Sequence, residues 1–164
     1  MGVHRWLVEA LGDPTARDQL GPDGFLPGPE WKAAVERVIR ARFGDLPAEE
    51  AALAVGAFLA HQFLESEAGR LTGESLRILP LDRALVAVLM PMSDRMRHGA
   101  QFDFRPRPEG GGFIDVRGEI AAGAATLLGF YQVMLALIPG EHEVRLAAQS
   151  HEFISLEVSV IARR

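Results

Sequence analysis

Apolar positions in the first two thirds of the chain recur at helical spacing. The range 31–43 has apolar residues three or four apart with charged residues between them, which predicts an amphipathic helix. The range 51–64 is apolar on nearly all sides except at His61 and Gln62, which predicts a helix buried all round. The range 81–97 carries an apolar stripe, and Pro91 within it predicts a kink or break. The stripe consists of Leu81, Leu85, Val88, Met92 and Met96.

Shorter segments connect these helices. The range 3–11 fits a short helix that stops at Gly12. Four glycines and four prolines lie between positions 12 and 29, and both residue types break helices and strands, so an ordered loop or short turns are expected there. Thr72 can cap a short turn through Leu76 and Ile78.

The apolar period changes from 3.6 to 2 near position 101, which predicts strands. QFDFR and FIDVR alternate apolar with polar residues on either side of Gly110, Gly111 and Gly112, so they predict a β-hairpin. HEVRLAAQ and FISLEVSV alternate in the same way, with a turn at Gln149–Ser150, and predict a second hairpin.

The range 120–138, between the two hairpins, contains no charged residue. As a helix it would be about 28 Å long, nearly the thickness of a bilayer's hydrocarbon core. A membrane span is not expected, because Glu119 and Glu141 flank the segment without an adjacent basic anchor, and because both hairpins would have to pair across the bilayer. We expect a long apolar helix buried inside a water-soluble fold.

The order of elements predicts an α+β protein in which N-terminal helices pack on a four-stranded antiparallel sheet of two hairpins, ββαββ, with the long apolar helix buried against it. One domain over 1–164 is expected. It has an N-terminal helix and Pro/Gly-rich loop (1–28), a helical part (29–99) and the ββαββ part (100–164). Because one domain of this size hides two fully apolar helices with difficulty, we expect a homodimer, and a monomer stays the alternative.

Composition narrows the classes of function. The chain is 48% apolar and 24% charged, which excludes global disorder. A net charge of −5 argues against nucleic-acid binding. The absence of cysteine excludes disulfides, thiolate nucleophiles and iron–sulfur clusters. The first residues do not resemble a secretory signal, so a cytoplasmic location is expected.

Six residues are candidate ligand contacts: Tyr131, Gln132, His61, Met90, Met92 and Met96. Tyr131 and Gln132 are the only strongly hydrogen-bonding pair in the uncharged helix. They suit the few polar contacts of an apolar cavity, and the alternative is that they bond to neighbouring backbone or across a dimer interface. Methionines adapt their shape to apolar pockets, although they also fill ordinary cores. His61 and Glu65 are four residues apart, a spacing that metal ligands use, but no further ligand pair accompanies them, so no metal site is expected.

The order of motifs resembles a myxobacterial paralogous domain family of unknown function. The similar features are an apolar helix containing FLES, a Leu/Pro-rich helix, the strand entry HGAQFDF, a hairpin, a Gly-containing apolar helix and a final hairpin. That family looks like a divergent relative of the fold shared by haem–nitric-oxide-binding domains, 4-vinyl-reductase domains and TRAPP transport-complex subunits. The resemblance implies helices layered on an antiparallel sheet, often with an apolar cavity between them, and a sensory or assembly role.

The resemblance also implies a test for haem. The haem branch uses an axial histidine and a Tyr-x-Ser-x-Arg motif, whereas this chain has Tyr131-Gln132-Val133-Met134-Leu135. His98 could stand near the proximal position, but nothing else agrees. No cofactor is therefore expected.

Three functions remain open at this stage. The first is a non-catalytic regulatory or sensory module that binds a partner protein or an apolar small ligand, since no nucleophile–base set is visible. The second is a small enzyme acting on an apolar substrate in a helix–sheet cavity, with His61 or Tyr131 as acid or base. The third is a structural subunit for dimerisation or scaffolding, which a monomer in light scattering would argue against.

Overall fold

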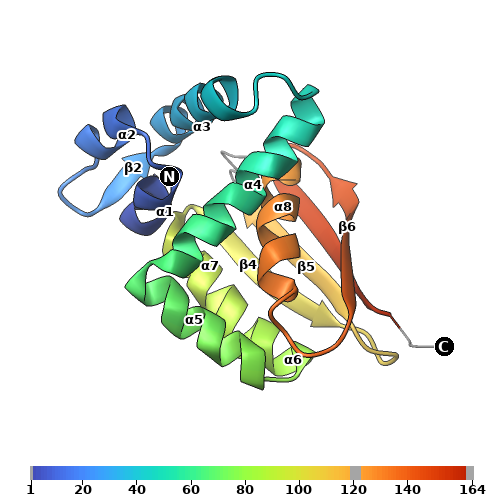
Figure 1. The fold of residues 1–164 in the computed structure, drawn as a ribbon. Coiled ribbons are helices and arrows are strands. Elements are labelled where there is room, and N and C mark those ends of the chain that lie inside the picture. The colour runs from blue at the N-terminus through green and yellow to red at the C-terminus, as the bar shows by residue number, and fades with distance from the viewer. Residues whose placement is uncertain (1, 119–122, 162–164) are drawn as a thin grey trace.

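The computed structural model describes residues 2–118 and 123–161, and it consists of a helical layer against an antiparallel sheet (Figure 1). The helical elements are α1 (Arg5–Leu11), α2 (Pro14–Asp18), α3 (Gly28–Arg42), α4 (Ala48–Glu65), α5 (Glu67–Ile78), α6 (Leu81–Ala84), the π-helical η1 (Leu85–Leu89), α7 (Met90–Met96) and α8 (Gly123–Leu135). The strands are β1 (Gly2–His4), β2 (Phe25–Pro27), β3 (Arg97–His98), β4 (Ala100–Pro106), β5 (Gly112–Gly118), β6 (His142–Gln149) and β7 (Phe153–Val160).

The expected four-stranded antiparallel sheet is confirmed. Its strand order is β4-β5-β7-β6, so the two hairpins join through the pairing of β5 with β7. Ile114 lies opposite Leu156, and both are fully buried on the face that meets the helices. Gly110 and Gly111 adopt positive φ angles of 94° and 69° in the first hairpin turn, a conformation that glycine tolerates without strain. The α+β class with a ββαββ part is therefore confirmed.

A second sheet, of three strands in the order β2-β1-β3, was not expected from the sequence. The first residues of the predicted helix 3–11 form β1, and Phe25–Pro27 within the predicted loop forms β2. Gly2 pairs with His98, although the N-terminal segment and nearly all of the helical part lie between them in the sequence. Strands of two or three residues are too short to show an alternating pattern, so their pairing leaves no local signal.

Helices α4 and α8 cross at very close range, and glycines make the crossing possible. A Cβ atom at Gly56 would lie 2.0 Å from the backbone oxygen of Thr126, and one at Gly129 would lie 2.0 Å from that of Leu53. The expectation that 51–64 is buried all round is wrong. Leu53 and Phe58 are only partly covered, because α8 takes up one face of α4 and nothing described covers the whole of the opposite face.

The long apolar helix is confirmed as α8, which lies between α4 and the sheet (Figure 1). The predicted residues 120–122 lie outside the described part of the chain, and the helix ends at Leu135 rather than Ile138. Within the described residues, no helix combines the length and apolarity needed to cross a bilayer.

Two further details differ from the sequence predictions. The short turn expected to begin at Thr72 is the interior of α5, which Ser66 caps by accepting a 3.0 Å hydrogen bond from the Gly69 amide. Ile78, expected to be part of that turn's apolar set, is 81% exposed. The cap arises because Ser66 directly follows α4 and both helices use it as their boundary residue.

Pro91 breaks the predicted helix 81–97 as expected, and the break takes the form of the π-helical turn η1 just before it. A π turn holds one more residue than an α turn, so the inward-facing position within η1 shifts by one, while Met92 and Met96 after it stay buried as predicted. Leu89 is therefore fully buried where the helical stripe predicted Val88, which is only partly covered.

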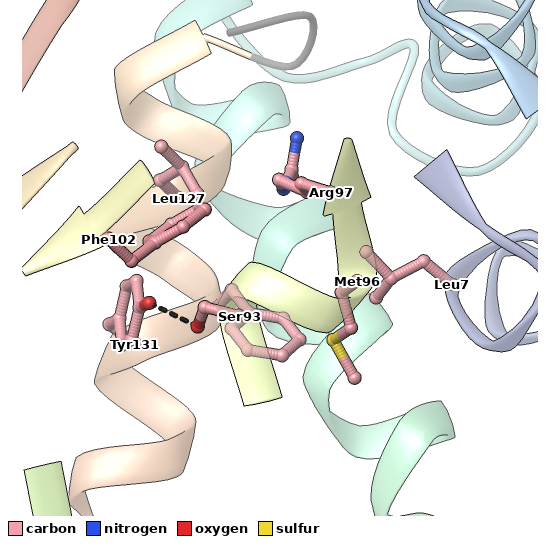
Figure 2. Close-up of a pocket in the computed structure, with 8 residues that line it drawn as sticks. Leu7, Ser93, Met96, Arg97, Phe102, Leu127 and Tyr131 are labelled. Atoms are coloured by element: carbon pink, nitrogen blue, oxygen red, sulfur yellow. Dashed lines mark hydrogen bonds between the residues drawn. The ribbon is translucent and has the colours of Figure 1, made fainter. Parts of the chain in front are cut away.

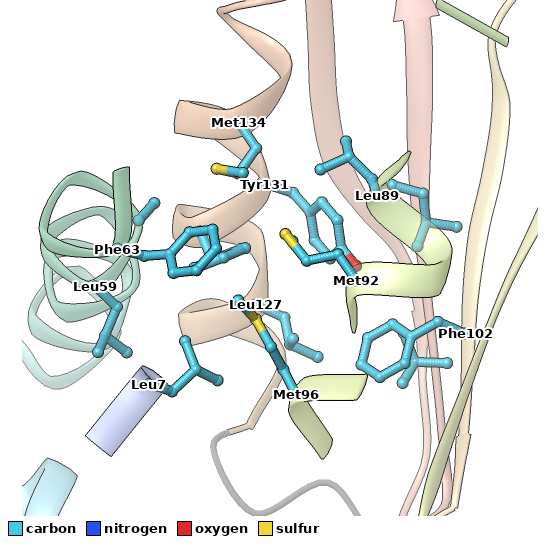
Figure 3. Packing of buried hydrophobic residues seen from close by; sticks show 14 of the residues in the cluster. Leu7, Leu59, Phe63, Leu89, Met92, Met96, Phe102, Leu127, Tyr131 and Met134 are labelled. Carbon is cyan, nitrogen blue, oxygen red and sulfur yellow. The ribbon is translucent and has the colours of Figure 1, made fainter. Parts of the chain in front are cut away.

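One contiguous apolar cluster runs from the N-terminal helices through α4, α7 and α8 to the sheet (Figure 3). Met92, Met96, Tyr131 and Met134 meet in its centre, with Phe63 on the α4 side (Figure 3). The cluster contains residues from all three predicted parts of the chain, so the apolar side chains of each part are buried against those of the others.

Asp13 ties the N-terminal segment to α3. Its carboxylate accepts a 2.9 Å hydrogen bond from the Ala16 amide and a 2.6 Å bond from Nη2 of Arg37. The Arg37 hydrogen bond holds the pKa of Asp13 below its ordinary value. An aspartate whose pKa is lowered by folding contributes its full stability above the unfolded-state pKa of about 3.9. That contribution is lost as the pH falls from there through the lower pKa of the folded state.

Asp13→Asn keeps the cap but removes the charge, so it should lower the free energy of unfolding at pH 7 by about 1 kcal/mol. At pH 3 the difference between wild type and variant should shrink. Urea unfolding at the two pH values measures both quantities, with the exposed Asp18→Asn as the matched control. An equal difference at both pH values would contradict the assignment.

Candidate functional site

A small cavity lies where α1, α7, β3, β4 and α8 meet (Figure 2). Its volume is about 20 Å³, room for one water molecule or a species of similar size. Most of its wall is apolar, and three side chains bring polar atoms to it. The lining residues are Leu7, Ser93, Met96, Arg97, Phe102, Leu127, Phe130 and Tyr131.

Tyr131 and Ser93 form the polar pair of the cavity (Figure 2). Their hydroxyl oxygens are 2.6 Å apart, and either can be the donor. Tyr131 is 1% exposed, and burial raises its pKa well above the ordinary value. The phenol therefore stays protonated near neutral pH and acts as a hydrogen-bonding hydroxyl rather than as a base.

Arg97 brings a positive charge to the same cavity. The chain leaves α7 at Arg97 and enters β3, which pairs with β1, and this turn directs the side chain into the interior. The residue is 9% exposed, and burial lowers its pKa to about 10. The guanidinium is still charged at neutral pH. Its side-chain nitrogens are not among the buried polar atoms of the described residues that lack a hydrogen-bond partner, so each of them has a partner or reaches solvent.

The structure separates the six predicted contacts. Tyr131 and Met96 line the cavity. Met90 is buried in the core, and Met92 is buried beside a surface groove of about 360 Å³ between α5 and α7. The methionines thus occupy both of the places considered from the sequence, since Met96 lines a cavity and Met90 fills the core.

The expectation that Gln132 and Tyr131 face one cavity is wrong. Neighbouring residues in a helix point about 100° apart, so Tyr131 faces the core and Gln132 is exposed. Gln132 and His61 both line a second surface groove of about 550 Å³ between α4, α5 and α8. His61 is exposed there and does not reach the cavity. The described residues include no group of three or more side chains that could hold a metal ion.

Sequence reasoning missed Ser93 and Arg97. Both lie beside the apolar stripe of α7, four positions apart and one position after Met92 and Met96 respectively. Two polar residues at the edge of a buried stripe are a weak signal, because the same positions in most helices reach solvent.

Searches of known proteins identify the fold but not a family. No protein-family profile matches the chain, and no curated protein matches it. Similar structures include an H-NOX protein from S. oneidensis in the Fe(II)NO ligation state, with a TM-score of 0.58 and 11% identity over 97% of this chain and 99% of that one. A mutant of an H-NOX protein from the same organism, in the Fe(II) state, gives 0.57 and 10% identity over 98% and 97%.

The NMR structure of an H-NOX domain from Shewanella oneidensis in the Fe(II)CO state gives a TM-score of 0.52 and 12% identity over 98% and 99%. These matches span almost the whole chain, so the chain has an H-NOX-like α+β fold. At a sequence identity near 11%, these matches establish the fold and no shared function. The resemblance to the myxobacterial family is not confirmed, whereas the wider fold that it implied is present.

The residues of this chain do not fit a haem. The cavity of about 20 Å³ is far smaller than the several hundred Å³ that sites for organic ligands occupy. No histidine of the described residues lines it. His98, the one candidate for an axial ligand, is exposed and stacks on Phe25 with ring centroids 3.7 Å apart. The phenol of Tyr131 is held protonated and bonded to Ser93, which disfavours it as an iron ligand.

Proposed function

We propose that this protein is a non-catalytic ligand-binding module of the sensory or regulatory class, and that its ligand occupies the cavity beside Tyr131. The observation that carries the proposal is the convergence of Ser93, Arg97 and Tyr131 on one cavity in an otherwise apolar interior. Ligand sites characteristically combine apolar walls with a few placed polar groups. The H-NOX-like fold supports the sensory class, because the similar structures are described in ligand-bound states.

The cavity limits the ligand to a few atoms. A larger apolar molecule, which the sequence also allowed, would have to displace Leu127 or Phe102 from positions where each is 3% exposed. A protein partner would act elsewhere on the surface. A homodimer, a cytoplasmic location and a fold comprising one domain remain proposals that accompany this function. Exposed apolar side chains on α5 and η1 are compatible with the homodimer: Leu71, Ile78 and Val86.

The enzyme alternative receives less support from the site. General acid–base catalysis needs a group that exchanges protons near the working pH. The raised pKa of Tyr131 and the charged Arg97 leave the cavity without such a group among the described residues. His61, the other candidate acid or base, lies at the separate groove.

Methionine methyl NMR tests the proposal with dissolved xenon, a neutral probe of atomic size. We expect the methyl signal of Met96, which lines the cavity, to shift on xenon addition. Met92 is buried but lines the surface groove rather than this cavity, so it provides the internal control. Met96→Leu and Met92→Leu assign the two signals. If neither xenon nor any small ion perturbs Met96, the cavity is not a ligand site and the proposed function is wrong.

A further inference from the structure

The two edges of the four-stranded sheet differ in how they are closed. At the β4 edge, α7 contacts the strand, and the carboxylate of Asp94 accepts a 2.9 Å hydrogen bond from the Phe102 backbone amide. This strand ends at Pro106, which has no amide proton to donate. At the other edge, no described element pairs with the outer side of β6 (Figure 1). An open edge presents a row of backbone donors and acceptors that can pair with another chain.

The backbone groups that β6 turns outward belong to every second residue. At the start of the ladder with β7, the Ile161 amide donates a 2.9 Å hydrogen bond to the carbonyl oxygen of Glu141, which lies opposite it. Bonded and non-bonded pairs alternate along an antiparallel ladder, so the next residues of β6 that bond to β7 are Glu143 and Arg145. The residues whose amides and carbonyls face the open edge are His142, Val144 and Leu146.

The charges of β6 are complementary to a second copy of the same strand. Glu143 and Arg145 are exposed on the sheet face away from the helices. When two copies run antiparallel with Val144 opposite the partner's Val144, each Glu143 lies opposite the partner's Arg145. The same register brings the outward backbone groups of both strands together. A register centred on Arg145 would instead place two arginines opposite each other.

We propose that two copies of this chain associate through their β6 edges, antiparallel and centred on Val144, so that their sheets join into one. The β-bulge between Leu146 and Ala148 confines the regular pairing to residues 142–146. Leu146 is 41% exposed in the single chain, and the partner strand covers it. This inference rests on the homodimer that accompanies the proposed function, names its surface, and is independent of the cavity beside Tyr131.

Backbone hydrogen exchange of the wild-type protein, followed by NMR, tests the pairing without any variant. At micromolar concentration, where a weak dimer dissociates, the amides of Val144 and Leu146 should exchange fast. At millimolar concentration their exchange should slow by about tenfold once about nine tenths of the chains are paired. The amides of Glu143 and Arg145 are the internal control, because pairing with β7 protects them at both concentrations.

Glu143→Arg tests the charge complementarity of the interface. It turns both ion pairs across the two-fold axis into repulsions, so the dissociation constant of the dimer should rise by about tenfold or more. Sedimentation equilibrium measures this constant, and circular dichroism verifies that the variant is folded. Asp103→Arg makes the same change of charge at an exposed position on the opposite edge strand. This matched control should leave the dissociation constant unchanged.

The possible results separate this interface from the other proposals. If the wild type stays monomeric at millimolar concentration, the inference and the proposed homodimer are both wrong. If it forms a dimer in which the Val144 amide still exchanges fast, or which Glu143→Arg does not weaken, the β6 interface is wrong and the homodimer uses another surface. The response of Met96 to xenon is measured separately, so the proposed ligand site stands or fails by itself.

Discussion

Gly129→Ala is expected to lower the free energy of unfolding by about 3 kcal/mol or more. Overpacking a core typically costs about 1–3 kcal/mol, and this site lies at the severe end. The added methyl group would meet the backbone oxygen of Leu53 at 2.0 Å, so α4 and α8 would have to move apart. Gly56→Ala should have a similar effect, since its Cβ would meet the Thr126 oxygen at 2.0 Å. Urea unfolding followed by circular dichroism measures the loss in the free energy of unfolding.

Gly73→Ala is the matched control, because Gly73 also lies in a helix. The tightest contact of its Cβ would be the end of the Leu64 side chain at 3.3 Å, which can rotate away, and the ends of Arg77 and Leu137 would lie at an ordinary 3.7 Å. The better helix propensity of alanine should make this variant neutral or stabilise it by up to about 1 kcal/mol. If Gly73→Ala and Gly129→Ala were to lose equal stability, the close crossing of α4 and α8 would be the wrong explanation.

Leu127→Ala should cost about 3 kcal/mol and enlarge the cavity beside Tyr131. Leu127 is 3% exposed and lines that cavity, and truncating a buried leucine typically costs 2–5 kcal/mol. The larger apolar space should then bind a small hydrocarbon such as benzene. Benzene is expected to raise the thermal midpoint of the variant and to leave that of the wild type unchanged.

Leu128→Ala provides the comparison, since Leu128 is the next residue of α8 but is only partly buried. It should lose less stability than Leu127→Ala and gain no benzene binding. Benzene binding by the wild type would show that the native cavity opens beyond about 20 Å³. The case for a ligand of only a few atoms would then be lost.

The sequence predicted most of the fold, because the signals for it are local and periodic. FISLEVSV alternates because one face of β7 is buried more than the other. The stretch around Tyr131 is uncharged because most of α8 is buried. The three-stranded sheet could not be predicted in this way. It depends on Gly2 meeting His98, a contact between segments that carry too few residues for any period.

The candidate site could be predicted from the sequence less well than the fold. Tyr131 could be found because a phenol in an uncharged helix is conspicuous, but Gln132 was paired with it only by adjacency in sequence. Arg97 could not be recognised, because arginines are mostly exposed and nothing local shows that this one is buried. Its importance appears only when β3, α7 and α8 are assembled around it.

The π turn before Pro91 has a consequence for tracing this protein's ancestry. Within η1 the buried position moves from Val88 to Leu89, while Met92 and Met96 beyond it stay buried where an uninterrupted helix would place them. A homologue without the extra residue of this turn would therefore bury a different side chain at this one level of the core. An alignment that ignores the gap would equate a buried position of one protein with a partly covered position of the other.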